Sequence, residues 1–108
     1  MPAIPAITVQ QLKKMRDDKQ PHVLVDVREP DEYEHCRIEG SKLIPLSELP
    51  KRVSELPKSG EIIVHCHHGG RSARAVEFLL QQGLSGAKNL AGGIDAWSAQ
   101  VDSSVPRY

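Results

Sequence analysis

Short runs of apolar and β-branched residues alternate with helical patterns along this chain, and this alternation limits its fold class. The run HVLVDV at residues 22–27 is continuous, which is typical of a strand buried on both faces of a sheet. Similar runs follow as KLIPL at 42–46, EIIVHC at 61–66 and AKNL at 87–90. The pattern predicts an α/β fold, with a mainly parallel sheet and helices on both of its faces.

The segments between these runs carry signals for helix starts and stops. Thr8 and Gln11 form a capping box ahead of a helical pattern, and Pro30 suits the first position of a second helix. Residues 71–83 place their apolar side chains on one face and finish at a glycine, as many helices do. A short last helix carries Trp97, which we expect to pack in the core.

The length of the chain favours one globular domain, and its charged residues give no excess of either sign. The chain has 108 residues, with Lys plus Arg equal to Asp plus Glu at 14 each. This balance argues against a nucleic-acid binder or a protein drawn to anionic membranes. No apolar run reaches the ~18 residues that span a bilayer, and no signal-peptide pattern opens the sequence. We expect a cytoplasmic monomer with a single domain over 1–108, a core at about 7–100 and an extended tail at 101–108.

The segment CHHGGRS at residues 66–72 concentrates reactive chemistry directly after a predicted strand. Ligands of parallel α/β sheets bind beyond the carboxyl ends of the strands, which is where Cys66 falls. Gly69 and Gly70 allow the chain to curl with its N–H groups inward, and the next helix adds unpaired N–H groups. Such a nest lowers the pKa of a central thiol. Cys66 is therefore the candidate nucleophile.

Side chains in the same loop add positive charge. Arg71 is a permanent cation that closes the loop, and we expect its charge to lower the pKa of Cys66. His67 and His68 are conditional cations, largely neutral at pH 7 by their ordinary pKa of about 6.5.

Three stretches carry a resemblance to a known family: LVDVREPDEYEHCRIEGSKLIPL, CHHGGRS and NLAGGIDAW. Their order and spacing are similar to those of the signature motifs of single-domain rhodaneses, a sulfurtransferase family, and they cover nearly the whole chain. The resemblance implies a rhodanese-like fold with a five-stranded, mainly parallel sheet and helices on both faces. It also implies that Cys66 accepts sulfur from a small donor such as thiosulfate and holds it as a persulfide. A thiol, cyanide or a protein then accepts the sulfur, and no cofactor is needed.

The resemblance further implies roles for individual residues. Asp26 and Arg28, in the motif DVRE, support the fold beside the site and take no part in the chemistry. Ser72 begins the helix behind the loop. The expected substrate-binding residues share the loop with the nucleophile: His67, His68, Gly69, Gly70, Arg71 and Ser72.

The sequence departs from the family pattern in two places. The run CRIEGS puts Cys36 where cysteine is not typical of the family. We expect Cys36 to be a small buried apolar residue, and both Cys36 and Cys66 to be free thiols. The loop also lacks the extra cation of the members that use thiosulfate best, so thiosulfate is expected as a test substrate.

Two other functions use a similar loop. Phosphatases and arsenate reductases of related fold use the spacing C-x5-R, whereas Cys66 and Arg71 give C-x4-R. The missing residue removes up to ~3.5 Å of chain, which leaves too small a ring for a tetrahedral oxyanion. A rhodanese module without activity, used for protein binding, is the second alternative. The presence of Cys66 in an intact loop argues against it.

A metal site is the remaining interpretation of the histidines and cysteines. It would use the residues around both motifs: His35, Cys36, His65, Cys66, His67 and His68. Neighbouring residues on a strand point to opposite faces, so His65 and Cys66 do not easily share one ion. We therefore predict no metal site and interpret His65 as the polar end of an apolar strand.

Overall fold

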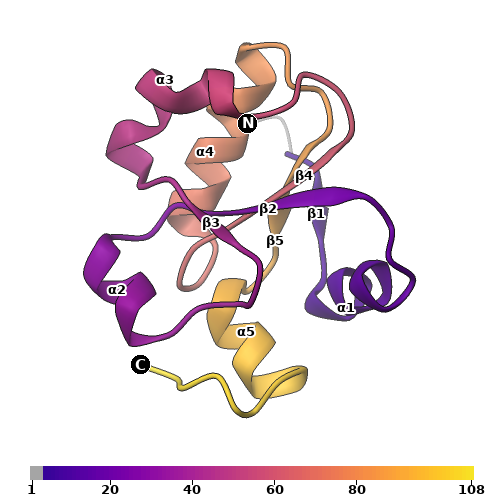
Figure 1. Cartoon of the computed structure of the whole chain (residues 1–108), viewed down its shortest axis with the longest axis vertical. Coiled ribbons are helices and arrows are strands. Elements are labelled where there is room, and N and C mark those ends of the chain that lie inside the picture. The colour runs from indigo at the N-terminus through magenta and orange to yellow at the C-terminus, as the bar shows by residue number, and fades with distance from the viewer. Residues whose placement is uncertain (1–3) are drawn as a thin grey trace.

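The computed structural model describes residues 4–108. It consists of one sheet with helices packed on both of its faces (Figure 1). Its strands are β1 (Ala6–Ile7), β2 (His22–Asp26), β3 (Lys42–Leu43), β4 (Glu61–His65) and β5 (Ala87–Leu90). They lie in the order β1-β5-β4-β2-β3, and every neighbouring pair is parallel. The predicted α/β class with a five-stranded parallel sheet is confirmed.

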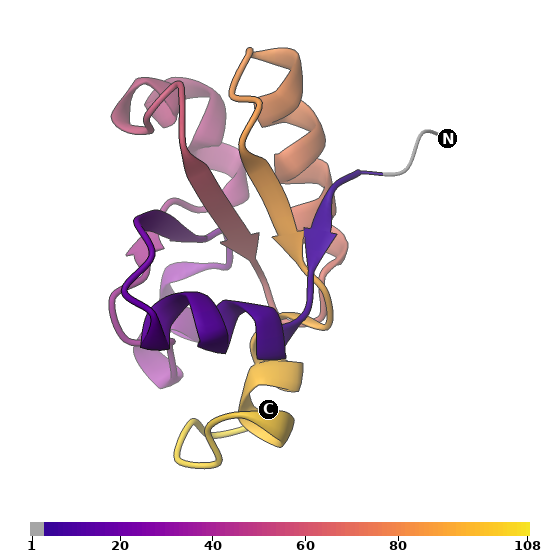
Figure 2. The same cartoon turned by 90° about the vertical axis from the view of Figure 1, so that its right-hand side faces the viewer.

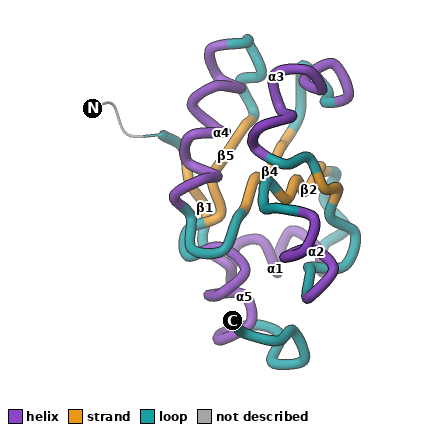
Figure 3. Tube along the Cα trace, turned by 90° about the vertical axis from the view of Figure 1, so that its left-hand side faces the viewer, coloured by secondary structure: helices purple, strands orange, loops and turns teal. Residues whose placement is uncertain are grey.

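The helices are α1 (Val9–Asp17), α2 (Pro30–His35), α3 (Leu49–Arg52), α4 (Gly70–Gln81) and α5 (Gly93–Gln100). Helices α3 and α4 cover one face of the sheet, and α1 and α5 cover the other (Figures 1 and 2). The trace in Figure 3 shows the loops that join strands to helices gathered between α4, α2 and α5. Within residues 4–108, no helix has both the length and the apolar character needed to cross a bilayer.

Alternate side chains of the central strand separate two apolar cores. Ile62 and Val64 of β4 pack toward α4, whereas Ile63 packs toward α1 and α5. This alternation is the reason that a continuous apolar run forms a strand with both faces buried. Trp97 of α5 is buried in the second core, as predicted, beside Leu12 of α1.

Local signals in the sequence account for most of the element ends. The capping box is present, with Thr8 N–H donating to Gln11 Oε1 at 2.7 Å and Gln11 N–H to Thr8 Oγ1 at 3.1 Å. Two details differ from expectation. Helix α4 begins at Gly70 and not at Ser72, because Gly69, at φ 119°, is its N-cap. Strand β1, which has two residues, is too short for a periodic pattern to reveal.

A fully buried ion pair lies at the carboxyl end of β2. Arg28 Nη2 donates to Asp26 Oδ2 at 2.7 Å, and both side chains are 0% exposed. Arg28 Nη2 also donates to the carbonyl oxygen of Cys36 at 2.6 Å. Burial by itself lowers the pKa of Arg28, but the hydrogen bonds to Asp26 raise it above its ordinary value. The guanidinium therefore stays charged inside the fold.

Asp26→Asn tests how far the fold depends on this pair. The substitution keeps the side-chain shape but leaves the buried charge of Arg28 without its counter-ion. We expect the free energy of unfolding, measured by urea denaturation, to fall by about 3–5 kcal/mol. Asp17→Asn is the matched control, because it removes a surface ion pair with Lys13 and should change stability little. Equal effects of the two substitutions would contradict this account.

Candidate active site

The loop that follows β4 wraps around the sulfur of Cys66. The N–H groups of Gly69 and Ser72 point at Cys66 Sγ, with N···S distances of 3.1 Å and 3.4 Å. The hydroxyl of Ser72 also lies 3.4 Å from Sγ. Cys66 is 2% exposed, so these groups surround a sulfur that is almost completely covered.

This environment shifts the pKa of Cys66 in two opposing directions. Burial raises the pKa of Cys66, because a thiolate loses its hydration. The hydroxyl of Ser72 and the backbone N–H groups of Ser72, Gly69 and Arg71 lower it, because each stabilises the negative sulfur. The hydrogen bonds prevail, and the pKa of Cys66 lies below its ordinary value.

Contacts with α5 hold the loop from the other side. Ile94 N–H donates to the carbonyl oxygen of Cys66 at 2.9 Å, and Asp95 N–H donates to that of His67 at 3.1 Å. Gly93 makes this approach feasible, since a Cβ atom there would lie 2.5 Å from both carbonyl oxygens. The motif GGIDAW therefore supplies the backbone against which the loop is shaped.

Asn89 of β5 is a site residue that sequence reasoning missed. Its Oδ1 lies 2.5 Å from Ser72 Oγ, and its Nδ2 donates to the carbonyl oxygen of Gly69 at 3.2 Å. The hydroxyl of Ser72 has one proton, so it serves either Asn89 or Cys66 at a given moment. A thiolate is charged and is the stronger acceptor of the two. The signal in the sequence was a polar residue near the end of the strand beside β4.

The side chain of Arg71 points to α2 and forms an ion pair with Glu32. Arg71 Nη1 and Nη2 lie 2.6 Å and 2.9 Å from the two carboxylate oxygens of Glu32. The hydrogen bond from Arg71 lowers the pKa of Glu32 to about 2, so the carboxylate is ionised at neutral pH. Glu32, which sequence reasoning also missed, therefore offsets the charge of Arg71 beside Cys66. The periodicity of α2 gave no signal for this contact.

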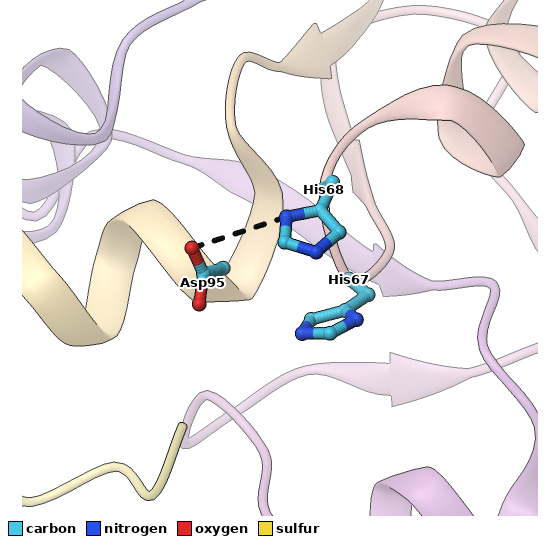
Figure 4. Close-up of side chains that lie close together, drawn as sticks. All are labelled: His67, His68 and Asp95. Carbon is cyan, nitrogen blue, oxygen red and sulfur yellow. Dashed lines mark ion pairs between the residues drawn. The ribbon is translucent and has the colours of Figure 1, made fainter. Parts of the chain in front are cut away.

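His67 and His68 lie on the outer side of the loop with Asp95 (Figure 4). The two imidazole centroids are 3.9 Å apart, and His68 Nδ1 is 3.9 Å from Asp95 Oδ2. One nitrogen or oxygen atom from each of the three residues lies within 4.8 Å of the others, close enough to meet at a metal ion. Both oxygens of Asp95, however, accept hydrogen bonds from Arg107, at 3.0 Å and 3.1 Å. A metal ion would have to displace this guanidinium.

Tyr108 contacts the loop from the end of the sequence. Its ring is stacked on that of His67, with a centroid distance of 3.9 Å and an interplanar angle of 5°. Its hydroxyl accepts a hydrogen bond from Arg28 Nη1 at 2.7 Å and donates one to Glu32 Oε2 at 2.8 Å. Burial, with Glu32 adding to its effect, raises the pKa of Tyr108 to about 12, so the phenol keeps its proton.

The remaining candidate residues lie below or beside the loop. Asp26 and Arg28 form the buried pair already described, and Cys36 is a buried free thiol with Arg28 Nη1 3.8 Å from its sulfur. His65 ends β4, as expected, but it is completely buried. Burial lowers the pKa of His65 to about 4, so its ring is neutral at pH 7. Within residues 4–108, neither of its ring nitrogens has a hydrogen-bond partner.

Comparison with known proteins identifies the family of this chain. The sequence model of the rhodanese-like domain family matches residues 8–100 of this chain. The chain belongs to this family. The solved structure of a rhodanese-like domain protein from Staphylococcus aureus covers 97% of this chain at a TM-score of 0.85, with 31% sequence identity and 99% of its own length matched. The predicted rhodanese-like fold is therefore confirmed.

Curated relatives are named for sulfur transfer. A protein of Allochromatium vinosum called "Sulfurtransferase" is 36% identical over 92 residues, with 85% of this chain and 86% of that protein covered. "Adenylyltransferase and sulfurtransferase MOCS3-1" of Zea mays is 37% identical over 115 residues and covers all of this chain. The chain spans 25% of the length of this maize protein.

Ser72→Ala tests the hydrogen bonding at the sulfur. Loss of the hydroxyl removes the largest contribution that lowers the pKa of Cys66. We therefore expect the midpoint of thiol alkylation against pH to move to higher pH. Ser41→Ala is the matched control, since that hydroxyl donates to Ile38 far from the loop and its loss should leave the midpoint in place. A midpoint that is unchanged in Ser72→Ala would show that the backbone N–H groups suffice.

Gly93→Ala tests the support from α5. A methyl group at this position meets the carbonyl oxygens of Cys66 and His67, so the loop has to shift away from α5. Gly40→Ala is the matched control, because Gly40 has a similar positive φ of 85° but no atom within 4 Å of the added Cβ. We expect both variants to lose about 1 kcal/mol or more of stability from backbone strain. Only Gly93→Ala should also slow alkylation of Cys66; equal rates in the two variants would contradict this role.

Proposed function

We propose that this protein is a sulfurtransferase that carries sulfane sulfur on Cys66 as a persulfide. The observation that carries the proposal is the convergence of two backbone N–H groups and one hydroxyl on Cys66 Sγ, which lowers the pKa of the thiol. Membership of the rhodanese-like family and the names of the relatives support the same class of reaction.

The reaction takes place in two displacement steps. In the first, the thiolate of Cys66 attacks the outer sulfur of a sulfane donor; with thiosulfate, the donor S–S bond breaks and sulfite leaves with the bonding electron pair. A new S–S bond of ~2.05 Å forms on Cys66, and its outer sulfur carries the negative charge. In the second step, a nucleophile such as cyanide or a thiolate attacks this outer sulfur, and the electrons of the S–S bond return to Cys66.

The loop residues stabilise both anions in this cycle. The N–H groups of residues 67 to 72 form the cradle, and those of Gly69 and Ser72 already point at Sγ. An outer sulfur bound to Cys66 is held by the same inward N–H groups, because the added bond is short relative to the loop. Asp26 and Arg28 keep β2 and α2 in place beside the loop.

The charges around the loop bear on the choice of donor. Arg71 is the cation next to Cys66 in the sequence, and its side chain is paired with Glu32. The positive charge that faces a substrate is therefore smaller than the sequence alone indicates. We propose that thiosulfate serves as a test donor, and that a thiol or a protein is a better acceptor than a second small anion.

A non-catalytic rhodanese module is a second candidate function, favoured by one observation. Cys66 is 2% exposed, and a nucleophile has to meet its substrate. A module that only binds another protein needs no access to this sulfur.

Intact-mass spectrometry after incubation with sulfane donors distinguishes the two functions. We expect thiosulfate or an organic persulfide to add ~32 Da, the mass of one sulfur atom, and the gain to map to Cys66. Cyanide or a thiol should then remove it. Cys66→Ser should lose both the mass gain and turnover while it stays folded, and persistent turnover would contradict the mechanism.

Cys36→Ser is the matched control for this experiment. Cys36 is buried beside Arg28 and stands apart from the loop, so its substitution should leave the mass gain and the turnover nearly unchanged. A large loss of turnover in Cys36→Ser would point to a redox role for the second thiol. Absence of a mass gain with every donor would favour the binding module.

A further inference from the structure

The sulfur of Cys66 is almost closed to solvent in this structure. The residue is 2% exposed, although its loop lies at the carboxyl edge of the sheet, where ligands approach. A reactant therefore reaches the sulfur only after some side chain at the rim of the loop has moved.

Tyr108 links the loop that carries Cys66 to helix α2. On the loop side, its ring is stacked on His67, the residue directly after Cys66. On the α2 side, its hydroxyl bonds to Glu32, which in turn holds Arg71. A single side chain thus joins α2 to the residue that follows the nucleophile in the loop.

The segment that carries Tyr108 is anchored at Val105, and Tyr108 itself is 42% exposed. Val105 is buried in the second apolar core, and its carbonyl oxygen accepts a hydrogen bond from Ser98 Oγ. The residues after Val105 are exposed, with Arg107 paired to Asp95. Lifting Tyr108 therefore breaks its two hydrogen bonds, its stacking on His67 and its weaker ring contacts with His35 and Arg28, while the segment stays anchored at Val105.

We propose that Tyr108 closes the entrance to Cys66 and has to swing aside before a bulky donor or acceptor reaches the sulfur. The closed position is held from both sides, by the ring of His67 and by the polar groups of Arg28 and Glu32. A small reactant needs only a partial displacement of the ring, whereas a large acceptor needs the open state. This inference concerns the accessibility of the thiol, and it rests on the proposed function only for the identity of the reactants.

Alkylation of Cys66 in Tyr108→Ala tests the proposal without any sulfur transfer. The probes are iodoacetamide, as a small reagent, and a polyethylene-glycol maleimide, as a large one. Rates are compared after correction for the thiolate fraction of each variant. We expect the large reagent to react about tenfold faster with Tyr108→Ala than with the unchanged protein, because the contacts that favour closure are lost. The gain with iodoacetamide should be smaller.

Cys36 is an internal reporter of general loosening. It is buried beside Arg28, and Arg28 keeps its bonds to Asp26 and to the carbonyl oxygen of Cys36 when Tyr108 is lost, so a local opening at the loop should leave alkylation of Cys36 slow. Faster alkylation of both cysteines in Tyr108→Ala would mean that the fold has loosened, and this would overturn the proposal. Equal rates for the large reagent in the unchanged protein and in Tyr108→Ala would overturn it as well.

Two phenylalanine variants complete the comparison. Tyr108→Phe keeps the ring on His67 but loses both hydrogen bonds, so its rate with the large reagent should fall between those of the other two proteins. Tyr33→Phe is the matched control, because it removes a phenol of α2 that bonds to Ser41 away from the loop, and its rate should not change. Faster labelling of Tyr108→Ala together with no sulfur loading from any donor would support the role of Tyr108 in closing the entrance to Cys66. It would contradict only the sulfurtransferase function.

Discussion

The hydrogen bonds from α5 to the carbonyl oxygens of Cys66 and His67 determine what the rest of the loop can do. A carbonyl oxygen carries partial negative charge and would repel a thiolate if it faced inward. Here the carbonyls of Cys66 and His67 are directed at the N-terminal turn of α5. The inner surface of the loop is left to N–H groups, which attract an anion. Gly93 is essential to this arrangement, because any Cβ at its position collides with both carbonyl oxygens.

A second constraint comes from α2, which has no buried side chain of its own. Apolar packing therefore does not fix this helix, and polar contacts position it. Arg28 bonds to the carbonyl oxygens of Glu32 and Cys36 at the end of the helix, and Asp26 balances its charge. Glu32 in turn holds Arg71. The buried pair at the end of β2 thus influences the loop from a distance, although neither of its members touches Cys66.

The elements that the sequence predicted correctly are those with strong local signals. The continuous apolar run of β4, the capping box at Thr8 and the glycines after Cys66 each act within a few residues, so a pattern reveals them. Glu32 gave no such local signal, and the place of Asn89 near a strand end did not reveal its contact with Ser72. Each meets its partner across the fold, and the partner is separated from it by 39 and 17 residues respectively.

For Arg71, the sequence identified the residue but not the partner of its side chain. Its spacing from Cys66 marks it correctly as a loop residue, and a cation beside a thiol is expected to lower the pKa of that thiol. The sequence gives no sign that the guanidinium is held by Glu32. The backbone N–H of Arg71 is one of the groups that lower the pKa of Cys66. The guanidinium interacts mainly with Glu32 and only secondarily with Cys66. The role of a charged side chain depends on the partner that the fold provides.

The groups inside the loop and the side chains at its rim have different roles in the site. Inside, the N–H groups and Ser72 offset the cost of keeping a negative sulfur out of water. A persulfide adds one sulfur at ~2.05 Å within the ring of N–H groups. Because α5 holds the carbonyl side of the loop, the additional volume has to come from the rim. The side chains at this rim include His67, which is stacked on Tyr108, and Arg71, which is paired with Glu32. Changes inside the loop therefore alter the pKa of Cys66, whereas changes at the rim alter which reactants reach it.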